Sequence, residues 1–222
     1  MGYPTIFAEL SIMPYQIKEI FYSLQGEGAQ AGRPAVFCRF AGCNLWSGRE
    51  EDREKAICQF CDTDFVGTNG ENGGRYETAW ILAHFIGEMW GSRSGHPYVI
   101  FTGGEPALQL DEDLLQAVHD LGFEAGVETN GTIALPEGLD WICVSPKAGS
   151  KIVQTYGDEL KLIYPQKSLK PEKFDDLDFR HFFIQPVDDE ACPDATQQAI
   201  DYCLTHPEWH LSLQTHKFLK IQ

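Results

Sequence analysis

The spacing of apolar residues divides the chain after residue 15 into two kinds of segment. In one kind, apolar and polar side chains alternate or short apolar runs occur, as is typical of β-strands. In the other, apolar residues recur every three or four positions, as is typical of helices. The predicted strands cover residues 16–22, 35–41, 98–101, 124–128, 141–144, 159–164, 181–184 and 210–214. The predicted helices cover residues 78–90, 111–121 and 194–204.

This order of strands and helices predicts an α/β fold with a mainly parallel sheet. A closed barrel of eight β/α units typically takes about 250 residues, and the units counted here are too few to complete one. We therefore expect an incomplete, open β/α barrel. In sheets of this kind the active site lies at the carboxyl ends of the strands.

Residues 1–222 are predicted to form a single domain, because no repeat, low-complexity tract or linker divides them. Residues 1–15 precede the first strand as an N-terminal extension. Residues 42–76 are predicted to be one long loop, rich in glycine and in charged side chains. A loop of that length is usually either functional or disordered.

Acidic residues outnumber basic ones, with 33 Asp and Glu against 17 Lys and Arg, and the formal net charge is −16. General binding to nucleic acid needs a basic face, so this class of function is not expected. An anionic small molecule can still bind where a few basic side chains gather in a cleft. The sequence has no apolar run of about 18 residues and no signal-peptide pattern. We therefore expect a cytoplasmic protein with no membrane partner.

Short polar motifs follow the predicted strands. They are TGGEP at residues 102–106, ETNG at 128–131, SPK at 145–147 and QPVD at 185–188. Each motif alone is also compatible with a strand-to-helix turn that carries capping residues. Because the carboxyl ends of parallel strands meet at one edge of a sheet, the motifs together predict a functional site there.

Three of the seven cysteines, Cys43, Cys58 and Cys61, lie in the long loop with the spacing C-x14-C-x2-C. Three thiolates can ligate three irons of a [4Fe–4S] cluster and leave the fourth iron open to an external ligand. The alternative is a structural zinc site with Cys38 as a fourth thiolate. Against it, Cys38 lies in the middle of a predicted strand, on the face opposite Arg39. The remaining cysteines, Cys143, Cys192 and Cys203, are expected to be ordinary buried thiols.

The motifs together resemble those of the radical S-adenosylmethionine superfamily and, more narrowly, those of the 7-carboxy-7-deazaguanine synthase family. The cysteine loop, TGGEP and ETNG carry the broader resemblance. The narrower one rests on residues 23–28 (SLQGEG), 32–35 (GRPA), 58–63 (CQFCDT) and 145–147 (SPK). The first cysteine gap departs from the superfamily, whose motif is usually C-x3-C-x2-C. We interpret it as an insertion that keeps all three thiols and is filled by a short helix.

The resemblance implies a carbon–nitrogen lyase of 7-deazapurine and queuosine biosynthesis, with the open barrel of radical S-adenosylmethionine enzymes. Such an enzyme converts 6-carboxy-5,6,7,8-tetrahydropterin into 7-carboxy-7-deazaguanine with loss of ammonia. The implied cofactors are a [4Fe–4S] cluster, S-adenosylmethionine and Mg²⁺, and the first two supply the radical chemistry. Two alternatives remain open: an enzyme that activates a glycyl radical on another protein, and a zinc-stabilised binding module.

The resemblance also assigns roles to residues of this sequence. S-adenosylmethionine is expected to bind Gly103, Gly104, Glu105, Ser145, Pro146, Lys147, Gln185, Pro186, Val187 and Asp188. The substrate is expected to bind Leu24, Gln25, Gly26, Glu27, Arg39, Thr102 and Gln222. Cys43, Cys58 and Cys61 would hold the cluster, and Thr63 would hold Mg²⁺. The competing interpretations are a solvated turn for Gln25 and Glu27, an interstrand ion pair for Arg39, and an Asx-type turn around Thr63.

The resemblance further implies an electron donor such as flavodoxin or ferredoxin, and a homodimer. The last residues add an expectation of their own, because Phe218, Leu219 and Ile221 are apolar. We expect this segment to dock on the body of the protein, unlike most chain ends. Docking would bring the Gln222 carboxylate toward the pocket, where it could accept hydrogen bonds from the pterin amino group. The alternative is a segment that merely covers the core or a dimer contact.

Overall fold

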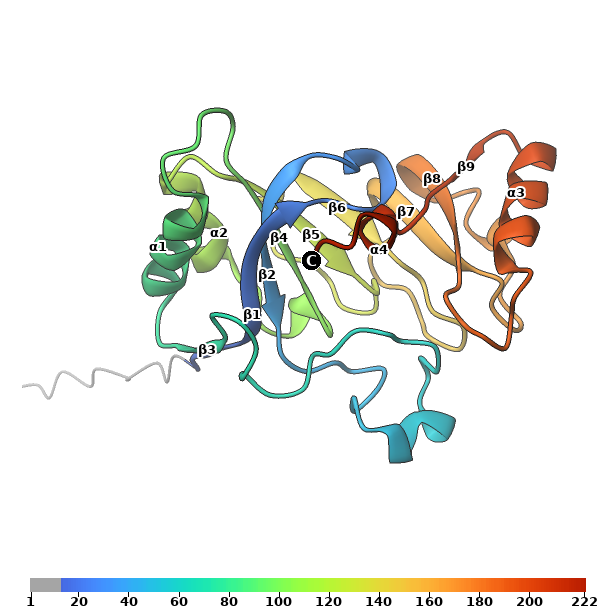
Figure 1. Ribbon diagram of the computed structural model, residues 1–222, viewed down its shortest axis with the longest axis horizontal. Coiled ribbons are helices and arrows are strands. Elements are labelled where there is room, and N and C mark those ends of the chain that lie inside the picture. Colours follow the sequence, from blue (N-terminus) through green and yellow to red (C-terminus); the bar gives the residue numbers. More distant parts are fainter. Residues whose placement is uncertain (1–12) are drawn as a thin grey trace, which may run out of the picture.

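The computed structural model describes residues 13–222, and its strands form one open sheet (Figure 1). The strand order is β3-β1-β2-β4-β5-β6-β7-β8-β9. Neighbours from β2 to β9 pair in parallel, whereas β1 pairs antiparallel with both β2 and β3. The strands are β1 (Tyr15–Leu24), β2 (Pro34–Phe40), β3 (Gly74–Tyr76), β4 (Tyr98–Gly103), β5 (Glu124–Thr129), β6 (Trp141–Val144), β7 (Tyr156–Tyr164), β8 (Asp178–Pro186) and β9 (Trp209–Leu211). The predicted α/β fold with a mainly parallel, incomplete barrel is confirmed.

Three helices pack against the strands and create two apolar cores. Helices α1 (Ala79–Trp90) and α2 (Glu112–Asp120) lie at one end of the molecule, and α3 (Ala195–Thr205) lies at the other (Figure 1). The first two begin at side-chain caps: Thr78 accepts from Ile81 N, and Asp111 accepts from Leu114 N. Such caps satisfy backbone N–H groups that have no partner within the helix. One core joins α1 and α2 to β1, β2, β4 and β5, and the other joins α3 to β6–β9.

Alternating side chains give the sheet an outer face toward the helices and an inner face. In β2, Val36, Cys38 and Phe40 are fully buried in the core beneath α1 and α2. Phe37 and Arg39, between them, point to the inner face, as the alternation predicted. The same alternation in β7 buries Leu160 and Leu162 against α3 and turns its polar residues inward. The inner face is therefore the side of the sheet on which polar groups gather.

Two predicted boundaries differ from the structure. Residues 42–76 are not loop throughout, because they contain the 3-10 helix η2 (Glu50–Lys55) and end in β3. The last predicted strand, 210–214, is also wrong in its bounds, since β9 ends at Leu211. Beyond it the chain crosses to the β1–β2 turn, where Thr215 N donates to Gly26 O (3.0 Å), and forms the short helix α4 (Thr215–Leu219). Most of the predicted N-terminal extension lies outside the described residues.

Candidate active site

A cavity of ≈ 460 Å³ extends over the inner face of the sheet. Its lining comes from β1 and β2, the cysteine loop, the carboxyl ends of β4–β8, and the last residues of the chain. Every site residue predicted from the sequence lines this cavity, except Glu105 and Pro146. Residues as far apart as Leu24 and Gln222 therefore meet in one place.

Cys43, Cys58 and Cys61 form one wall of the cavity. A hydrogen bond from Cys58 lowers the pKa of Cys61 to about 6, although burial opposes the shift. Among residues 13–222, no three His, Cys, Asp or Glu side chains converge tightly enough for one metal ion. In a [4Fe–4S] cluster, however, each thiolate ligates its own iron. The three thiols beside an open cavity therefore fit a cluster with one free iron.

Cys38 lies apart from these thiols. It is fully buried on the outer face of β2, in the core with α1 and α2. Burial raises the pKa of its thiol well above the usual range. Its neighbour Arg39 lies on the opposite face and lines the cavity. The four-thiolate zinc site is therefore excluded, because one of its ligands points into the core.

Gly103 and Gly104 bring the backbone of β4 against the start of the cysteine loop. A Cβ on Gly104 would lie 2.0 Å from Gly42 O and 2.9 Å from Cys43 Cβ, and a Cβ on Gly103 would lie 2.2 Å from Phe40 O. Gly103 also has a φ of +133°, a region that favours glycine. No side chain fits at these two positions, so their backbone groups lie directly against the start of the cysteine loop. Such backbone groups are suited to bind the methionine part of a cofactor.

The structure does not bring Glu105 to the cavity with the other predicted cofactor residues. Its carboxylate is fully buried and accepts hydrogen bonds from Thr129 Oγ1 (2.6 Å), Asn130 N (2.8 Å) and Ala107 N (3.0 Å). Burial raises the pKa of this carboxyl, although these donors oppose the shift. Glu105 thus ties the end of β4 to the end of β5.

The ends of β6 and β8 carry polar groups that do face the cavity. Lys147 Nζ donates to the backbone oxygen and Oγ of Ser145, both at 2.7 Å. Burial lowers the pKa of Lys147, and the nearby thiols of Cys58 and Cys61 favour its charged form. Pro146 turns away, and its carbonyl accepts from Gln166 (3.1 Å). From β8, buried Gln185 accepts from Ser212 Oγ (2.8 Å).

A second wall, facing the same cavity, is built from carboxylates around one lysine. Lys161 Nζ lies 2.8 Å from Glu27 Oε2 and 2.9 Å from Glu128 Oε2. Gln25 Nε2 donates to the other oxygen of Glu128 (3.0 Å), and Gln214 Nε2 donates to Glu27 (3.1 Å). Burial alone would raise the pKa of Glu27, but the charge and hydrogen bond of Lys161 lower it to about 2. We call Glu27, Glu128 and Lys161 the carboxylate wall.

Arg39 lines the cavity and also forms an ion pair. Its Nε lies 2.7 Å from Glu19 Oε1 on the adjacent strand β1. The interstrand pair that competed with a substrate-binding role is therefore present. Among residues 13–222, the two terminal guanidinium nitrogens of Arg39 donate no hydrogen bond. Arg39 can thus be oriented by Glu19 and still offer donors to a ligand.

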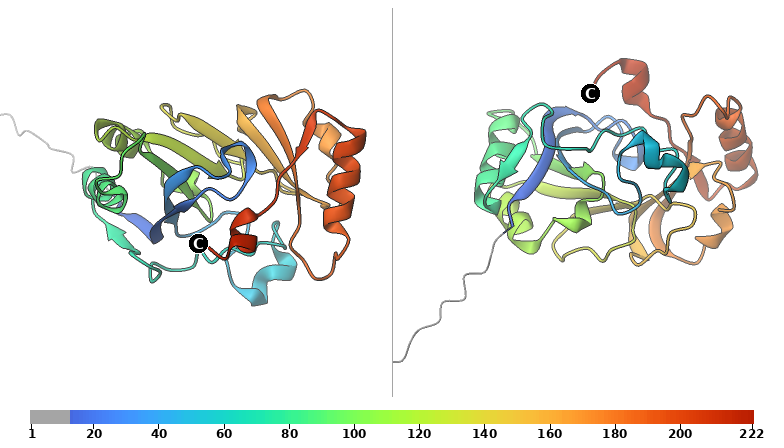
Figure 2. Two further views of the ribbon diagram at one scale, coloured as in Figure 1. Left: turned by 45° about the horizontal axis from the view of Figure 1, so that its top comes forward. Right: turned by 90° about the horizontal axis from the view of Figure 1, so that it is seen from below.

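The C-terminal segment docks over the cavity, but through polar contacts, because the apolar residues Phe218, Leu219 and Ile221 that motivated this prediction are exposed. Ser23 Oγ donates to the Gln222 backbone oxygen (2.6 Å), and Gln222 lines the cavity. Lys217 in α4 pairs with Asp62 of the cysteine loop (2.6 Å) and with Asp188 after β8 (2.5 Å). Figure 2 shows α4 beside that loop. The segment therefore joins two sides of the cavity mouth.

Several polar residues of the lining were not predicted from the sequence, among them Glu19, Lys161 and His216, and Glu128 was included only as part of the ETNG motif, without a role of its own. The predicted site rests on polar motifs that follow strands, whereas Glu19 and Lys161 lie within strands and His216 lies in α4. A signal was present for Lys161, because a charge inside the apolar run of residues 159–164 sits at an alternating position. Such a residue indicates a polar inner face.

Known proteins were compared with the chain. No family model matches it. The 7-carboxy-7-deazaguanine synthase of Bradyrhizobium diazoefficiens is 60% identical over 210 residues, covering 95% of this chain and 100% of that protein. The synthase of Bordetella pertussis is 60% identical over 209 residues, covering 94% and 100%. The crystal structure of QueE from Escherichia coli aligns with a TM-score of 0.65 and 26% identity, over 90% of this chain and 93% of that one.

Family membership follows from these relatives, and it implies a [4Fe–4S] cluster and S-adenosylmethionine. The three thiols and the close-packed glycines fit these two groups. Within residues 13–222, no helix is both long enough and apolar enough to cross a bilayer. The chain belongs to the 7-carboxy-7-deazaguanine synthase family of radical S-adenosylmethionine enzymes.

Proposed function

We propose that the cavity is where this chain converts 6-carboxy-5,6,7,8-tetrahydropterin into 7-carboxy-7-deazaguanine with loss of ammonia. One observation carries the proposal: the cysteine wall and the carboxylate wall face the same cavity. The first suits a cluster with an open iron, and the second suits a nitrogen-rich ring with several N–H donors. A glycyl-radical activator must instead admit a segment of another protein, and nothing in the carboxylate wall serves that purpose.

The cluster and S-adenosylmethionine, when bound, supply the one-electron chemistry that starts the reaction. Cys43, Cys58 and Cys61 would hold the cluster. Backbone groups at Gly103 and Gly104, with Ser145 and Lys147, would bind the methionine part of the cofactor. Residues 185–188 would bind its nucleoside. Glu105 supports this site indirectly, since its hydrogen bonds fix the ends of β4 and β5.

The substrate would lie against the carboxylate wall. Glu27 and Glu128 are acceptors for the ring N–H and the exocyclic amino group, and Gln25 is oriented by its bond to Glu128. Arg39, held by Glu19, offers planar donors to the substrate carboxylate. Leu24, Gly26, Thr102 and the Gln222 carboxylate complete the pocket. His216 packs directly on Gly26, where only glycine fits, because an added Cβ would lie 2.3 Å from the His216 ring.

Thr63 would bind Mg²⁺ together with oxygens of the substrate. It lines the cavity two residues after Cys61, and Mg²⁺ is often held by few protein oxygens and completed by ligand oxygens. The competing Asx-type turn at residues 62–64 is not found in the described part of the chain, where the Asx-type bond starts one step later and runs from Val66 N to Asp64 Oδ1 (3.1 Å). Thr63→Ala should abolish Mg²⁺ stimulation of turnover without changing the iron–sulfur spectrum. Full stimulation in the variant would remove Thr63 from the metal site.

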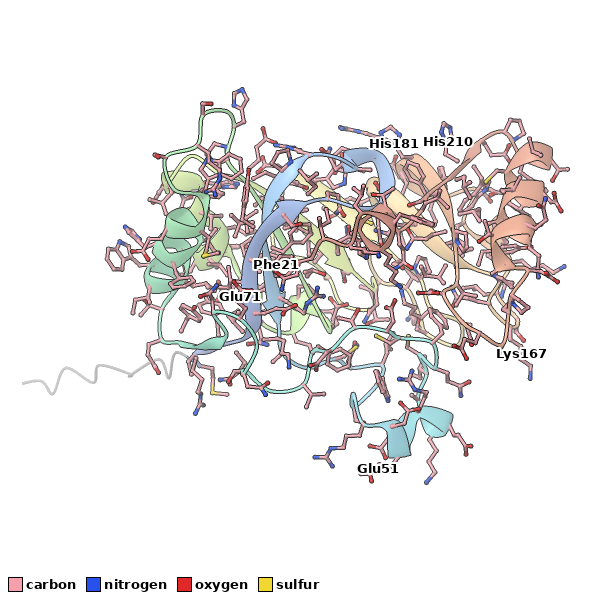
Figure 3. The ribbon with its side chains drawn as sticks, viewed as in Figure 1. Phe21, Glu51, Glu71, Lys167, His181 and His210 are labelled. Atoms are coloured by element: carbon pink, nitrogen blue, oxygen red, sulfur yellow. The ribbon has the colours of Figure 1, made fainter. Side chains whose placement is uncertain are left out.

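The enzyme would act in the cytoplasm as a homodimer and take its electron from a flavodoxin or ferredoxin. The family gives the homodimer and the electron donor, whereas the cytoplasmic location is expected from the sequence. The exposed cysteine loop supports the approach of an electron donor. Figure 3 shows Glu51 of η2 at the outer end of this loop, away from the sheet. A donor protein could therefore approach the loop without entering the substrate side of the cavity.

The decisive experiment is anaerobic turnover. Protein reconstituted with iron and sulfide is mixed with S-adenosylmethionine, a reductant, Mg²⁺ and 6-carboxy-5,6,7,8-tetrahydropterin, and products are followed by mass spectrometry. We expect 7-carboxy-7-deazaguanine and ammonia. Cleavage of S-adenosylmethionine without any deazapurine product would reject the proposed substrate while keeping the radical enzyme.

A further inference from the structure

Lys161 is a charged residue in a place where lysine is seldom found. It lies in β7 between the core residues Leu160 and Leu162, and only 3% of its side chain is exposed. Its two partners face the cavity, with 17% of the Glu27 side chain and 22% of the Glu128 side chain exposed. Glu27 comes from the β1–β2 turn and Glu128 from β5, so the lysine joins three parts of the fold.

The groups around Lys161 explain why it is charged. Besides Glu27 and Glu128, the acidic groups near it are Glu159 on its own strand and the Cys143 thiol on β6, and these raise its pKa although burial opposes the shift. Lys147 on the β6 side is the other cation near it. His216 in α4 faces Glu27 and favours its ionised form. Glu159 is occupied elsewhere, accepting from Ala29 N (2.9 Å) and from Cys143 Sγ (3.4 Å).

Removing the lysine would leave Glu27 and Glu128 close together at the edge of the cavity. Two neighbouring carboxylates without a cation do not both ionise readily, because each repels the charge of the other. One of them would take up a proton and become a donor. The pair would then no longer offer two acceptors to a bound ring.

We propose that Lys161 is a specificity-determining positioning residue, which keeps Glu27 and Glu128 ionised side by side so that the cavity selects ligands with adjacent N–H donors. This inference rests on the proposed function. The chemical class selected is a ring with a guanidine-like edge, in which an exocyclic amino group stands beside a ring N–H. A ring with a carbonyl oxygen in place of that amino group would point an acceptor at a carboxylate and be rejected.

The test measures binding, so it does not depend on turnover. The full chain is titrated with 6-carboxypterin and with 6-carboxylumazine, which carries a carbonyl oxygen at the position of the amino group. For the wild type we expect a preference of at least about tenfold for the pterin. The pKa of Glu27 is about 2, so Glu27 stays ionised between about pH 5 and pH 7 and should not itself make the affinity vary over this range.

In Lys161→Met, the preference should fall to about threefold or less. Affinity for the pterin should now drop as the pH is lowered, because protonation of the carboxyl pair removes an acceptor. The double variant Glu128→Gln/Lys161→Met keeps the net charge of the wall and removes the repulsion. It should keep a weak preference, and its affinity should depend less on pH than that of Lys161→Met, because burial but no second carboxylate now raises the pKa of Glu27. Arg33→Met is the matched control, since it breaks the Arg33–Glu124 pair (2.5 Å), which lies outside the cavity lining.

Retained preference and a flat pH profile in folded Lys161→Met would overturn the inference and leave Lys161 a purely structural role. A double variant that keeps the tenfold preference would overturn it as well, and this variant decides the question if Lys161→Met does not fold. Failure of the wild type to bind 6-carboxypterin is a separate result, which would reject the proposed function itself.

Discussion

The two walls of the cavity are held in place in different ways. The carboxylate wall stands on the sheet, where backbone ladders position Glu128 in β5 and Lys161 in β7. The cysteine wall lies in a loop with little regular structure, fastened by Gly42 N to Phe65 O (3.1 Å) and by the packing of Trp46 on Phe65. Folding alone therefore prepares the carboxylate wall, whereas the cysteine wall would also depend on the cluster that we propose it binds.

Removing one thiol of the cysteine wall should have the largest effect that distinguishes the two walls. Cys58→Ala should abolish cofactor cleavage, because the cluster then loses one of its three protein ligands. Thermal stability and binding of 6-carboxypterin should change little, since the carboxylate wall is independent of the loop. Iron content, cleavage of S-adenosylmethionine and the melting temperature of Cys43→Ala, Cys58→Ala and Cys61→Ala measure this.

Cys38→Ala is the matched control for the thiols. It lies in the core, so it should lower stability by about 1–3 kcal/mol through a cavity and still allow the cluster to form. Loss of the cluster in Cys38→Ala would contradict the separation of the two kinds of cysteine.

Gly104→Ala tests the point at which the two regions meet. The added methyl group would collide with Gly42 O and Cys43 Cβ, so we expect a loss of about 1–3 kcal/mol in stability together with weak binding of S-adenosylmethionine. Gly87→Ala in α1 is the control, because its Cβ would meet Leu121 Cδ1 at 3.6 Å, an ordinary contact. Equal cofactor binding by both variants would argue against a backbone cradle at Gly104.

Arg39→Lys tests the substrate side alone. A lysine keeps the charge and can keep the pair with Glu19, but it lacks the planar fork that matches a carboxylate. We expect 6-carboxypterin to bind at least about tenfold more weakly, equivalent to about 1.4 kcal/mol, with an unchanged cluster spectrum. Unaltered affinity would leave Arg39 with the interstrand pair as its only role.

The smallest expected effect comes from the end of the chain. A C-terminal tag moves the Gln222 carboxylate from its place beside Ser23, so it should lower turnover by about two- to tenfold, within the range of one lost hydrogen bond. The same tag at the N-terminus should have little effect. A large fall in melting temperature with the C-terminal tag would instead indicate that α4 serves mainly to cover the core.

Local patterns in the sequence determined the fold class and the edge of the sheet at which the polar motifs meet. Alternation within residues 35–41 placed Cys38 and Arg39 on opposite faces, and the structure agrees because a strand turns successive side chains through about 180°. The polar motifs after the strands met at one edge because parallel strands end there together. Both inferences need only neighbours along the chain.

The tertiary structure alone decided which polar groups meet across the sheet. Glu27, Glu128 and Lys161 are far apart in the sequence, and they converge because the β1–β2 turn reaches across the inner face to β5 and β7. Glu105 was predicted to bind the cofactor from its motif, but its carboxylate accepts a hydrogen bond from Thr129 on the next strand. The sequence of a motif does not determine which of these two partners a carboxylate has. Hydrogen bonds and ion pairs between distant segments depend on the curvature of the sheet and on the path of its connections. Neither of these can be predicted from the spacing of apolar residues in the sequence.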